Sequence, residues 1–532
     1  MKNKFFNRFD WAAFWAATLV TLAVYFFTLG PSVGLEDSGE LATAGAHLGV
    51  PHPPGYPFWT LCSWIFCKLF SWVSYMGHPT PAWCISLFSA VAGALAAGCT
   101  AMLISRSSQD FLTGGEESVE DESTKSLIPM LSFAGGVAGA LTFSLSPVEW
   151  SQSTIVEIYS LNALFLMAVF LLSYRWMRQP SDRILWMTAW VFGLGRTNER
   201  VLRFAIGPLA IVILLKDLSM FRTVFIYLMP VALTYQILQV GSLYQANHFM
   251  QSDAIAKHNP VLTATSCPSQ CFVLLGVTLL VASLIAVAVL KDKDRAKANK
   301  LALYLGGAGA VVLLLSATLF TTTIEWVGVT AISAPLVDPR RYAFVAAFIA
   351  GSVVASVLAF LQDDELPMGD ARVTKFLIPG VVLGVIAIVI AASVPSADLQ
   401  GYRGVPYPWG KSTLMFSIPL ILLFVLCSFV KRGFCFAIPV AALHLAAFTL
   451  LKHGAMNGLT HPQSWWFWWP IAWNFVLLGL TWVMLPHGRS VAGAAFFAQL
   501  GVSFYAYMPI VSDLRNPPMN WGYPRTWEGF KH

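Results

Sequence analysis

Apolar residues are grouped along this chain in long runs, and short polar segments separate the runs. The runs occupy residues 11–30, 82–104, 127–146, 156–174, 184–195, 201–216, 221–240, 270–290, 301–320, 342–361, 375–393, 412–430, 434–451, 465–485 and 491–510. About 20 apolar residues are enough for a helix to cross a bilayer. Backbone groups in lipid must be paired internally, and the runs lack two-residue alternation. The pattern therefore predicts an all-α polytopic integral membrane protein with about 15 transmembrane helices.

Composition supports this class. The chain of 532 residues is 57% hydrophobic and only 11% charged, whereas soluble proteins carry about 25% charged residues. The net charge of +6 does not indicate a nucleic-acid partner, because the basic residues form short clusters between apolar runs. Clusters of that kind record membrane orientation. The lipid bilayer is thus the first predicted partner.

The basic clusters also predict an orientation. With Met1 in the cytoplasm, most of the 33 lysine and arginine residues fall in inner segments, as the positive-inside rule requires. The run near the N-terminus is then an uncleaved first helix, because it is longer than the core of a signal peptide. This orientation holds only if 57–76 does not cross. Lys68 and flanking prolines favour a helix that lies at the outer surface.

The first outer loop, 31–81, contains the densest group of polar residues. Glu36, Asp37 and Glu40 fall within five positions, and the Pro-rich segment HPPGYP follows at 52–57. One interpretation is structural, because Asp37 or Ser38 can cap a helix and Glu40 suits its first turn. The other is catalytic, because a carboxylate in a cleft at the bilayer edge can take a proton from an acceptor hydroxyl.

The Pro-rich segment itself allows two interpretations. Three prolines and Gly55 make a rigid hinge that leads into the surface helix. In addition, His52 can carry a proton or donate to an anionic phosphate, and Tyr56 lies beside it.

The second outer loop, 147–156, leads into an apolar helix through further polar residues. Glu157, Tyr159 and Asn162 lie at the outer end of that helix. Polar residues at membrane depth are candidates for function. We expect Glu157 to lie level with the acids of the first loop, so that both loops face one cleft.

Two groups of arginines have less specific interpretations. The segment GLGRTNERVLRF (193–204) contains Arg196, Arg200 and Arg203 between two short apolar runs. These side chains can reach toward the membrane surface, pair internally or bind a lipid phosphate. Arg340 and Arg341 form a second basic site, and a pair of that kind at a helix end is more typical of a membrane anchor.

The cysteines do not predict a metal centre. The eight cysteines include no CxxC pair, and neither zinc nor haem spacing is present. Most lie in apolar runs as small hydrophobic residues.

Three long motifs resemble one family. EDSGELATAGAHLGVPHPPGYPFWTL, SPVEWSQSTIVEIYSLNALF and YMPIVSDLRNPPMNWGYPRTWEGF are similar to the domain-of-unknown-function 2723 family, whose animal members are protein O-mannosyltransferases of the transmembrane protein 260 type. The resemblance implies a class C glycosyltransferase with many spans and an active site on the outer side. It also implies a polyprenyl-phosphate sugar as donor and an essential acid in the first outer loop.

Carried onto this sequence, the resemblance predicts Asp37 as that acid, with Glu36 as the runner-up and Glu40 in the same cleft. The expected substrate-binding residues are His52, Tyr56, Glu157, Tyr159, Asn162, Arg340 and Arg341. The segment GRTNER (195–200) departs from a Gly-Asn-His-His stretch of the family, which leaves the role of this region open. No cofactor or metal is expected to be obligatory, although the clustered acids can also hold a metal ion.

The predicted reaction is inverting transfer of a sugar, with mannose favoured, to Ser or Thr hydroxyls of extracytoplasmic proteins. A transporter or flippase of lipid-linked or small polar substrates is the alternative, and a scaffold protein is a third. We expect one multi-span domain over 1–510, and 511–532 as the start of an extracytoplasmic region of a longer protein. The absence of Asn-x-Ser/Thr sequons favours a bacterial inner membrane with a periplasmic active face, rather than the ER membrane.

Overall fold

The structure is a computed structural model that describes residues 5–34, 36–113, 122–251, 409–430, 433–452 and 464–525, with a few isolated positions beyond these ranges. The chain divides into two compact units. The first contains Met1–Lys216 and Gly493–His532, and the second contains Asp217–Ala492. The predicted spans between 270 and 393 lie outside the described residues, as do Arg340 and Arg341.

The described part of the chain is almost entirely helical, and eight of its helices are long and apolar enough to cross a membrane. They are α1 (Arg8–Phe27), α4 (Pro81–Thr113), α5 (Glu122–Ser144), α7 (Tyr159–Arg178), α10 (Leu218–Gln251), α16 (Gly433–Lys452), α17 (Trp465–Met484) and the segment Gly488–Leu514. The prediction of an all-α polytopic membrane protein is confirmed. The count of about 15 remains a prediction, because several of the runs fall outside the described residues.

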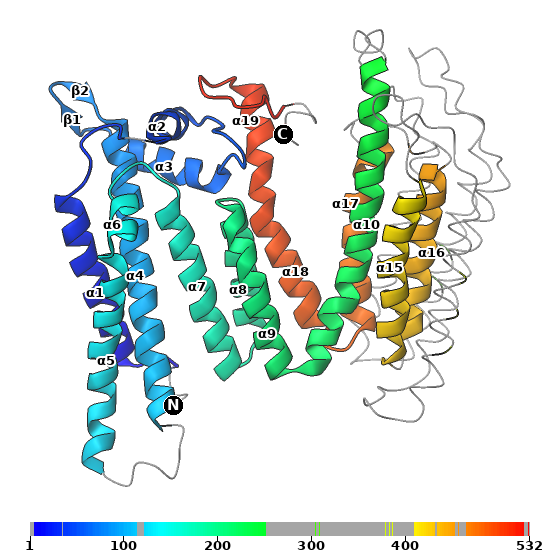
Figure 1. Cartoon of the computed structure of the whole chain (residues 1–532), viewed down its shortest axis with the longest axis horizontal. Helices are drawn as coiled ribbons and strands as arrows, with labels where there is room; N and C mark the ends of the chain where they lie inside the picture. The colour runs from blue at the N-terminus through cyan, green and yellow to red at the C-terminus, as the bar shows by residue number, and fades with distance from the viewer. Residues whose placement is uncertain are drawn as a thin grey trace. The chain divides into compact units, whose positions relative to one another are not determined.

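The first unit is organised around α4, which packs against α1, α5 and α7 (Figure 1). Alanine, glycine and serine dominate the buried surface of α4. Small residues let helix backbones approach closely, which is how helices associate in lipid. The long central helix therefore provides a firm base for the loops at its N-terminal end.

Short elements gather at that end of the first unit. They are α2 (Ser38–His47), α3 (Pro57–Leu69), the hairpin of β1 (Ser74–Tyr75) and β2 (His78–Pro79), and α6 (Pro147–Ser153). Figure 1 shows α3 lying across the long helices. With 13 residues, α3 is too short to span a bilayer, which agrees with a helix at the membrane surface.

Two of the predicted spans form short helices. The runs 184–195 and 201–216 form α8 (Asp182–Arg196, 15 residues) and α9 (Ile206–Lys216, 11 residues), joined by the 3-10 helix η1 (Arg200–Ala205). At 1.5 Å per residue these helices rise about 22 Å and 16 Å, less than the roughly 30 Å of a hydrocarbon core. That these two runs cross the membrane stays a prediction. The polar GRTNER segment interrupts the helical pattern.

The end of the described chain returns to the first outer loop. Helix α18 (Gly488–Val502) continues through η4 (Ser503–Ala506) into α19 (Tyr507–Leu514). Beyond it, the Val50 amide donates to the Met519 carbonyl at 2.8 Å, and the Trp521 amide donates to the Val50 carbonyl at 2.9 Å. The described part of the predicted C-terminal region thus pairs with the loop that carries the candidate acids.

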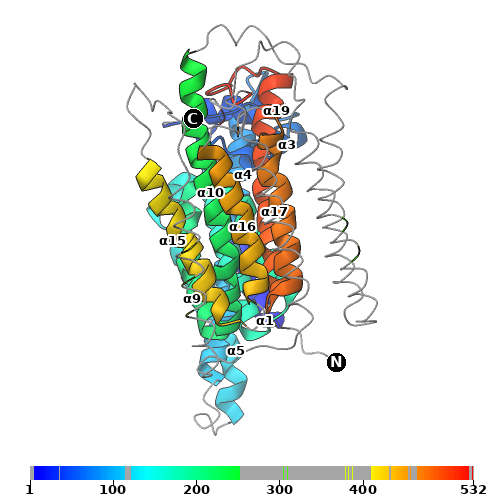
Figure 2. The same ribbon diagram turned by 90° about the vertical axis from the view of Figure 1, so that its right-hand side faces the viewer.

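The second unit is a helical bundle of α10, α15 (Trp409–Ser428), α16 and α17 (Figure 2). Within it, the fully buried His444 has its Nε2 3.0 Å from Thr234 Oγ1 and accepts a hydrogen bond there from Trp473 Nε1 at 3.2 Å. This polar contact joins three helices of the bundle. Hydrogen bonds of this kind hold helices together where no water is available.

Candidate active site

Asp37 stands at the start of α2 with its carboxylate free of the helix. It occupies the N-cap position, but its side chain makes no capping hydrogen bond. The neighbouring Ser38 hydroxyl points elsewhere and donates to the Val156 carbonyl at 3.3 Å. The Asp37 side chain is 61% exposed. The capping interpretation of these residues is therefore wrong, because neither side chain satisfies an amide of the first turn.

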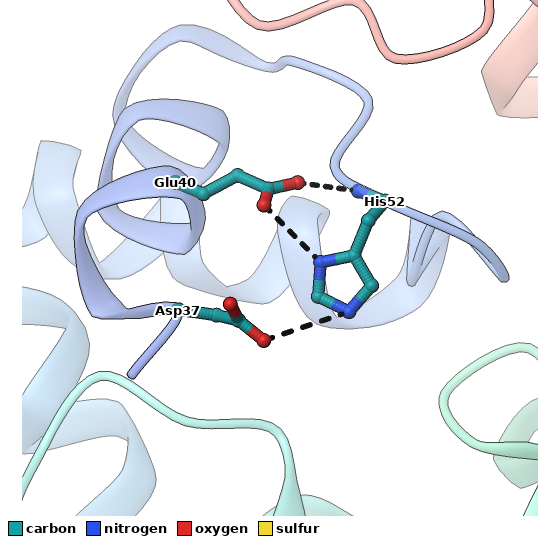
Figure 3. Close-up of side chains that lie close together, drawn as sticks. All are labelled: Asp37, Glu40 and His52. Atoms are coloured by element: carbon teal, nitrogen blue, oxygen red, sulfur yellow. Dashed lines mark hydrogen bonds and ion pairs between the residues drawn. The ribbon is translucent and has the colours of Figure 1, made fainter. Parts of the chain in front are cut away.

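His52 connects the acids of α2 to the Pro-rich segment. Its backbone amide donates to Glu40 Oε1 at 2.5 Å, and its ring Nδ1 lies 3.3 Å from Glu40 Oε2. On the other side of the ring, Nε2 lies 3.9 Å from Asp37 Oδ2. Figure 3 shows the imidazole between the two carboxylates. Glu40 thus holds both the backbone and the ring of His52, and the ring faces Asp37.

Tyr56 completes the surroundings of the imidazole. Its hydroxyl lies 2.8 Å from His52 Nε2, and burial raises the pKa of this hydroxyl, with the charge of Glu199 as a further cause. Tyr56 therefore keeps its proton and can donate it to Nε2.

The turn before Tyr56 is built for a close approach. Gly55 has φ of +85°, in the left-handed region that glycine favours. A Cβ at this position would lie 2.5 Å from Met508 Cε of α19. The turn is closed by the Gly55 amide, which donates to the His52 carbonyl at 2.9 Å. The HPPGYP segment is thus a tight turn, as the hinge interpretation predicted, and the same turn carries His52 and Tyr56.

The second outer loop is fastened to several elements through its backbone. The Glu157 carbonyl accepts hydrogen bonds from Trp59 Nε1 of α3 and from Ser89 Oγ of α4, both at 3.1 Å. Trp59 is fully buried, and Val156 beside Glu157 is also fully buried. Together with the bond from Ser38, these contacts set the position of Glu157 against the first loop.

The Glu157 side chain is 4% exposed. Burial raises the pKa of its carboxyl to about 7, and the charges of Glu36 and Asp37 raise this pKa as well. This electrostatic effect shows that the acids of the two loops are close enough to influence one another. Near neutral pH, Glu157 is therefore divided between a form that donates a hydrogen bond and a form that accepts one.

The other predicted residues surround this centre. Glu36 is exposed and has φ of +61°. Tyr159 is 47% exposed at the first position of α7, and the Asn162 Oδ1 atom is buried without a hydrogen-bond partner. Arg340 and Arg341 lie outside the described residues and stay a prediction.

Asn198 helps to hold the second outer loop in place, and the sequence did not predict this role. It is fully buried, and its Nδ2 donates to the Ile158 carbonyl at 3.1 Å. The adjoining Arg196 carbonyl accepts from the Tyr505 hydroxyl at 3.2 Å. The GRTNER segment thus joins the second loop to η4. Its departure from the family pattern drew attention to it, but the pattern of residues did not indicate this contact.

One group at the site has the spacing of metal ligands. Asp37, Glu40 and His52 each offer one ligand atom, and these atoms lie within 4.8 Å of one another. Two carboxylates and an imidazole suit a divalent ion. In the present geometry, however, Glu40 and His52 satisfy one another, so that the group is also complete as a hydrogen-bond network.

Comparison with known proteins agrees with the geometry. Residues 37–221 match the model of the protein O-mannosyl-transferase TMEM260 N-terminal domain. The range begins at Asp37 and includes the second loop and Asn198. The resemblance to that family is confirmed for this part of the chain.

Two curated relatives bear this name. The mouse protein O-mannosyl-transferase TMEM260 is 32% identical over 184 residues, which are 34% of this chain and 22% of the mouse protein. The Dictyostelium discoideum protein O-mannosyl-transferase tmem260 is 24% identical over 200 residues, which are 35% of this chain and 21% of that protein. The matched part of the chain spans about a fifth of the length of these relatives. No solved structure matches the chain.

Proposed function

We propose that this chain is a membrane glycosyltransferase that moves a sugar, with mannose favoured, from a polyprenyl-phosphate donor to Ser or Thr hydroxyls of extracytoplasmic proteins. The observation that carries the proposal is the Asp37 carboxylate, which is exposed, unused by its helix and faced by a histidine that Glu40 orients. It lies in the range that matches the O-mannosyl-transferase family model.

The proposed reaction is a direct displacement. Asp37 takes the proton of the acceptor hydroxyl, and the hydroxyl oxygen forms a bond to the anomeric carbon of the sugar. The bond between that carbon and the phosphate oxygen breaks, and the polyprenyl phosphate leaves with the electron pair. A single displacement inverts the anomeric centre. Asp37 is preferred over Glu40 as the base because both Glu40 oxygens already contact His52, one through a hydrogen bond from the backbone amide and one 3.3 Å from ring Nδ1.

The neighbouring residues support this base. His52, which Glu40 holds in place, puts its Nε2 3.9 Å from Asp37 Oδ2. Glu157, whose pKa is raised to about 7 by burial, provides a second carboxyl that can donate a hydrogen bond to a sugar hydroxyl. Tyr56, Tyr159 and Asn162 are further proposed contacts of the substrate.

The proposed location is an integral membrane protein of a bacterial inner membrane, with the site on the periplasmic face. The site adjoins the ends of membrane-spanning helices, where a lipid-linked donor and an aqueous acceptor can meet. Because a monophosphate leaving group has less need of a divalent ion than a diphosphate, no obligatory metal is proposed.

The test measures sugar transfer from radiolabelled polyprenyl-phosphate mannose to membrane proteins by the full chain in membranes. Asp37→Asn is compared with wild type at matched expression, with Asp513→Asn, an exposed carboxylate of α19, as the control. We expect transfer by wild type and the control, and a loss of at least a hundredfold with Asp37→Asn. Equal transfer by Asp37→Asn would overturn the proposed base. No transfer by wild type from any lipid-linked sugar would overturn the enzyme in favour of a transporter.

A further inference from the structure

The short helix η1 between α8 and α9 presents two different faces. Leu202 and Ala205 are each 2% exposed and belong to the buried cluster beneath the site. Gly195 makes room for this packing, because a Cβ there would lie 2.4 Å from Leu202 Cδ2. The segment is therefore held in a defined orientation by its buried face, and what its other face displays is a fixed feature of the fold.

The outward face of η1 combines cations with apolar groups. Arg200 and Arg203 are exposed, and between and beside them Val201 is 52% and Phe204 71% exposed. The Arg203 guanidinium lies 5.7 Å from the centre of the Phe204 ring. A surface with guanidinium groups and apolar side chains side by side matches a ligand that has an anionic head and a hydrocarbon chain.

Neither of these arginines has a carboxylate partner within the part of the chain that the structure describes. Arg196 differs, because its Nη1 donates to the Arg200 carbonyl at 2.7 Å and thereby braces the turn. The side chain of the adjacent Glu199 accepts from the Arg200 backbone amide at 2.6 Å and caps η1. The two exposed guanidinium groups thus keep all of their donors for a ligand.

The apolar surroundings of η1 favour an anionic ligand. Arg200 and Arg203 lie at the junction of two apolar helices, next to the exposed Val201 and Phe204. Unpaired charges in such surroundings are costly in a membrane. A phosphate group carried on a lipid is the natural counter-ion there, because guanidinium and phosphate form paired, charge-assisted hydrogen bonds.

The position of η1 beside the candidate active site indicates which lipid the phosphate belongs to. Asn198, two residues before Arg200, donates to the Ile158 carbonyl next to Glu157. The charge of Glu199 acts on the Tyr56 hydroxyl, which contacts His52. A phosphate held by η1 therefore lies beside the residues proposed to handle the sugar.

We propose that Arg200 and Arg203 bind the phosphate of the polyprenyl-phosphate donor, while Val201 and Phe204 contact the first part of its hydrocarbon chain. This inference rests on the proposed function for the identity of the lipid. The phosphate remains bound to the same arginines as it becomes the leaving group, so that they stabilise the charge that develops when the bond to the sugar breaks.

The test uses the full chain in nanodiscs of phosphatidylcholine and measures binding by the shift in melting temperature. The probes are polyprenyl phosphate, the corresponding polyprenyl alcohol and phosphatidylglycerol. The variants are Arg200→Gln, Arg203→Gln and the double variant, with Arg183→Gln at the opposite end of α8 as the control. Asp37→Asn is included because it removes the proposed base and leaves the arginines in place.

We expect polyprenyl phosphate to stabilise wild type, Arg183→Gln and Asp37→Asn, and the alcohol to have no effect. Each η1 variant should weaken binding about tenfold, since a hydrogen bond to a charged group is worth about 1.4 kcal/mol or more. Equal stabilisation by the alcohol, or unchanged binding by the double variant, overturns the proposal. Equal stabilisation by phosphatidylglycerol overturns it in favour of a general lipid anchor.

Measuring lipid binding and sugar transfer separately distinguishes the proposed phosphate site from the proposed transferase activity. If wild type binds polyprenyl phosphate through the arginines but transfers no sugar, the phosphate site stands and the transferase does not. If wild type transfers sugar and the double variant does so with an unchanged KM for the donor, the transferase stands and the phosphate site does not.

Discussion

Glu40 holds His52 at two points, through the backbone amide at 2.5 Å and through ring Nδ1 at 3.3 Å. A single carboxylate thus sets both the path of the chain and the orientation of the imidazole. The opposite side of the ring faces Asp37. The surroundings of Asp37, the proposed base, therefore depend on Glu40, three positions further along the chain.

Glu40→Gln tests this dependence. The amide keeps an acceptor for the His52 amide but loses the negative charge that orients the ring. We expect kcat to fall on the order of tenfold to a hundredfold while KM for the acceptor changes little, because the base is misplaced and substrate contacts persist. Steady-state transfer measurements check this. A larger effect on KM than on kcat would contradict a positioning role.

Glu157 predicts a dependence of stability on pH. Its pKa is raised to about 7 in the folded protein, above the ordinary value near 4.5, so the folded state binds the proton more tightly. Burial of the Glu157 carboxyl therefore costs least below pH 4.5, where the group is protonated in both states. The free energy of unfolding falls as pH rises from 4.5 toward 7. The shift limits the effect to about 3 kcal/mol.

Melting temperatures from pH 5 to pH 8 in detergent check this sign. Glu157→Gln should be more stable than wild type at pH 8, and its advantage should shrink at pH 5. Asp513→Asn serves as the exposed control and should follow wild type. An advantage that is the same at both pH values would show that the carboxyl does not titrate as described.

Asn198→Ala should weaken the second outer loop. The substitution removes one of two donors to the Ile158 carbonyl, which keeps the Asn162 amide at 3.2 Å, and the loss of one hydrogen bond costs about 0.5–1.5 kcal/mol. We expect a lower melting temperature and reduced transfer. Gln179→Ala removes an amide at an exposed position and should leave both unchanged. If Asn198→Ala melts like wild type, the hydrogen bond does not hold the loop.

Gly49→Ala should disturb the pairing between the first loop and the C-terminal segment. The new Cβ would lie 2.6 Å from the Met519 carbonyl oxygen, and backbone on both sides leaves little freedom to move. A cost of about 1–3 kcal/mol is expected, measured by thermal melting. Gly135→Ala is the matched control, since a Cβ there meets nothing within 4 Å.

Removal of divalent ions tests the chemistry of Asp37, Glu40 and His52. If the three act as a hydrogen-bond network, transfer in excess EDTA should equal transfer without it. Loss of transfer in EDTA that manganese or magnesium restores would instead identify them as metal ligands. Wild-type transfer with polyprenyl-phosphate mannose is the measurement.

Much of this arrangement could be predicted because its signals are local. The long apolar runs predicted the helices, and the family resemblance predicted that Asp37, Glu40 and His52 lie together, as their ligand atoms do within 4.8 Å. Lys68 and the prolines predicted a surface helix where α3 lies. In each case the residues that determine the local structure are close together in the sequence.

The features that were not predicted depend on contacts between distant segments. Asn198 appeared only as part of a polar interruption, and nothing near it in sequence indicates that it binds Ile158. The run 201–216 was expected to be one helix, but it begins as the 3-10 helix η1 and continues as α9 from Ile206, because apolar composition alone does not show where a helix starts. The meeting of Val50 with Met519 likewise joins segments far apart in the chain.

That meeting has a consequence for how the protein is made. Chains are synthesised and inserted from the N-terminus, so the first outer loop emerges early. Its backbone partners at Met519 and Trp521 are synthesised after all of the spanning helices that the structure describes. The first outer loop therefore lacks these backbone hydrogen bonds while the earlier helices are inserted into the membrane. The candidate site therefore reaches its described arrangement only after the last described helix has been made.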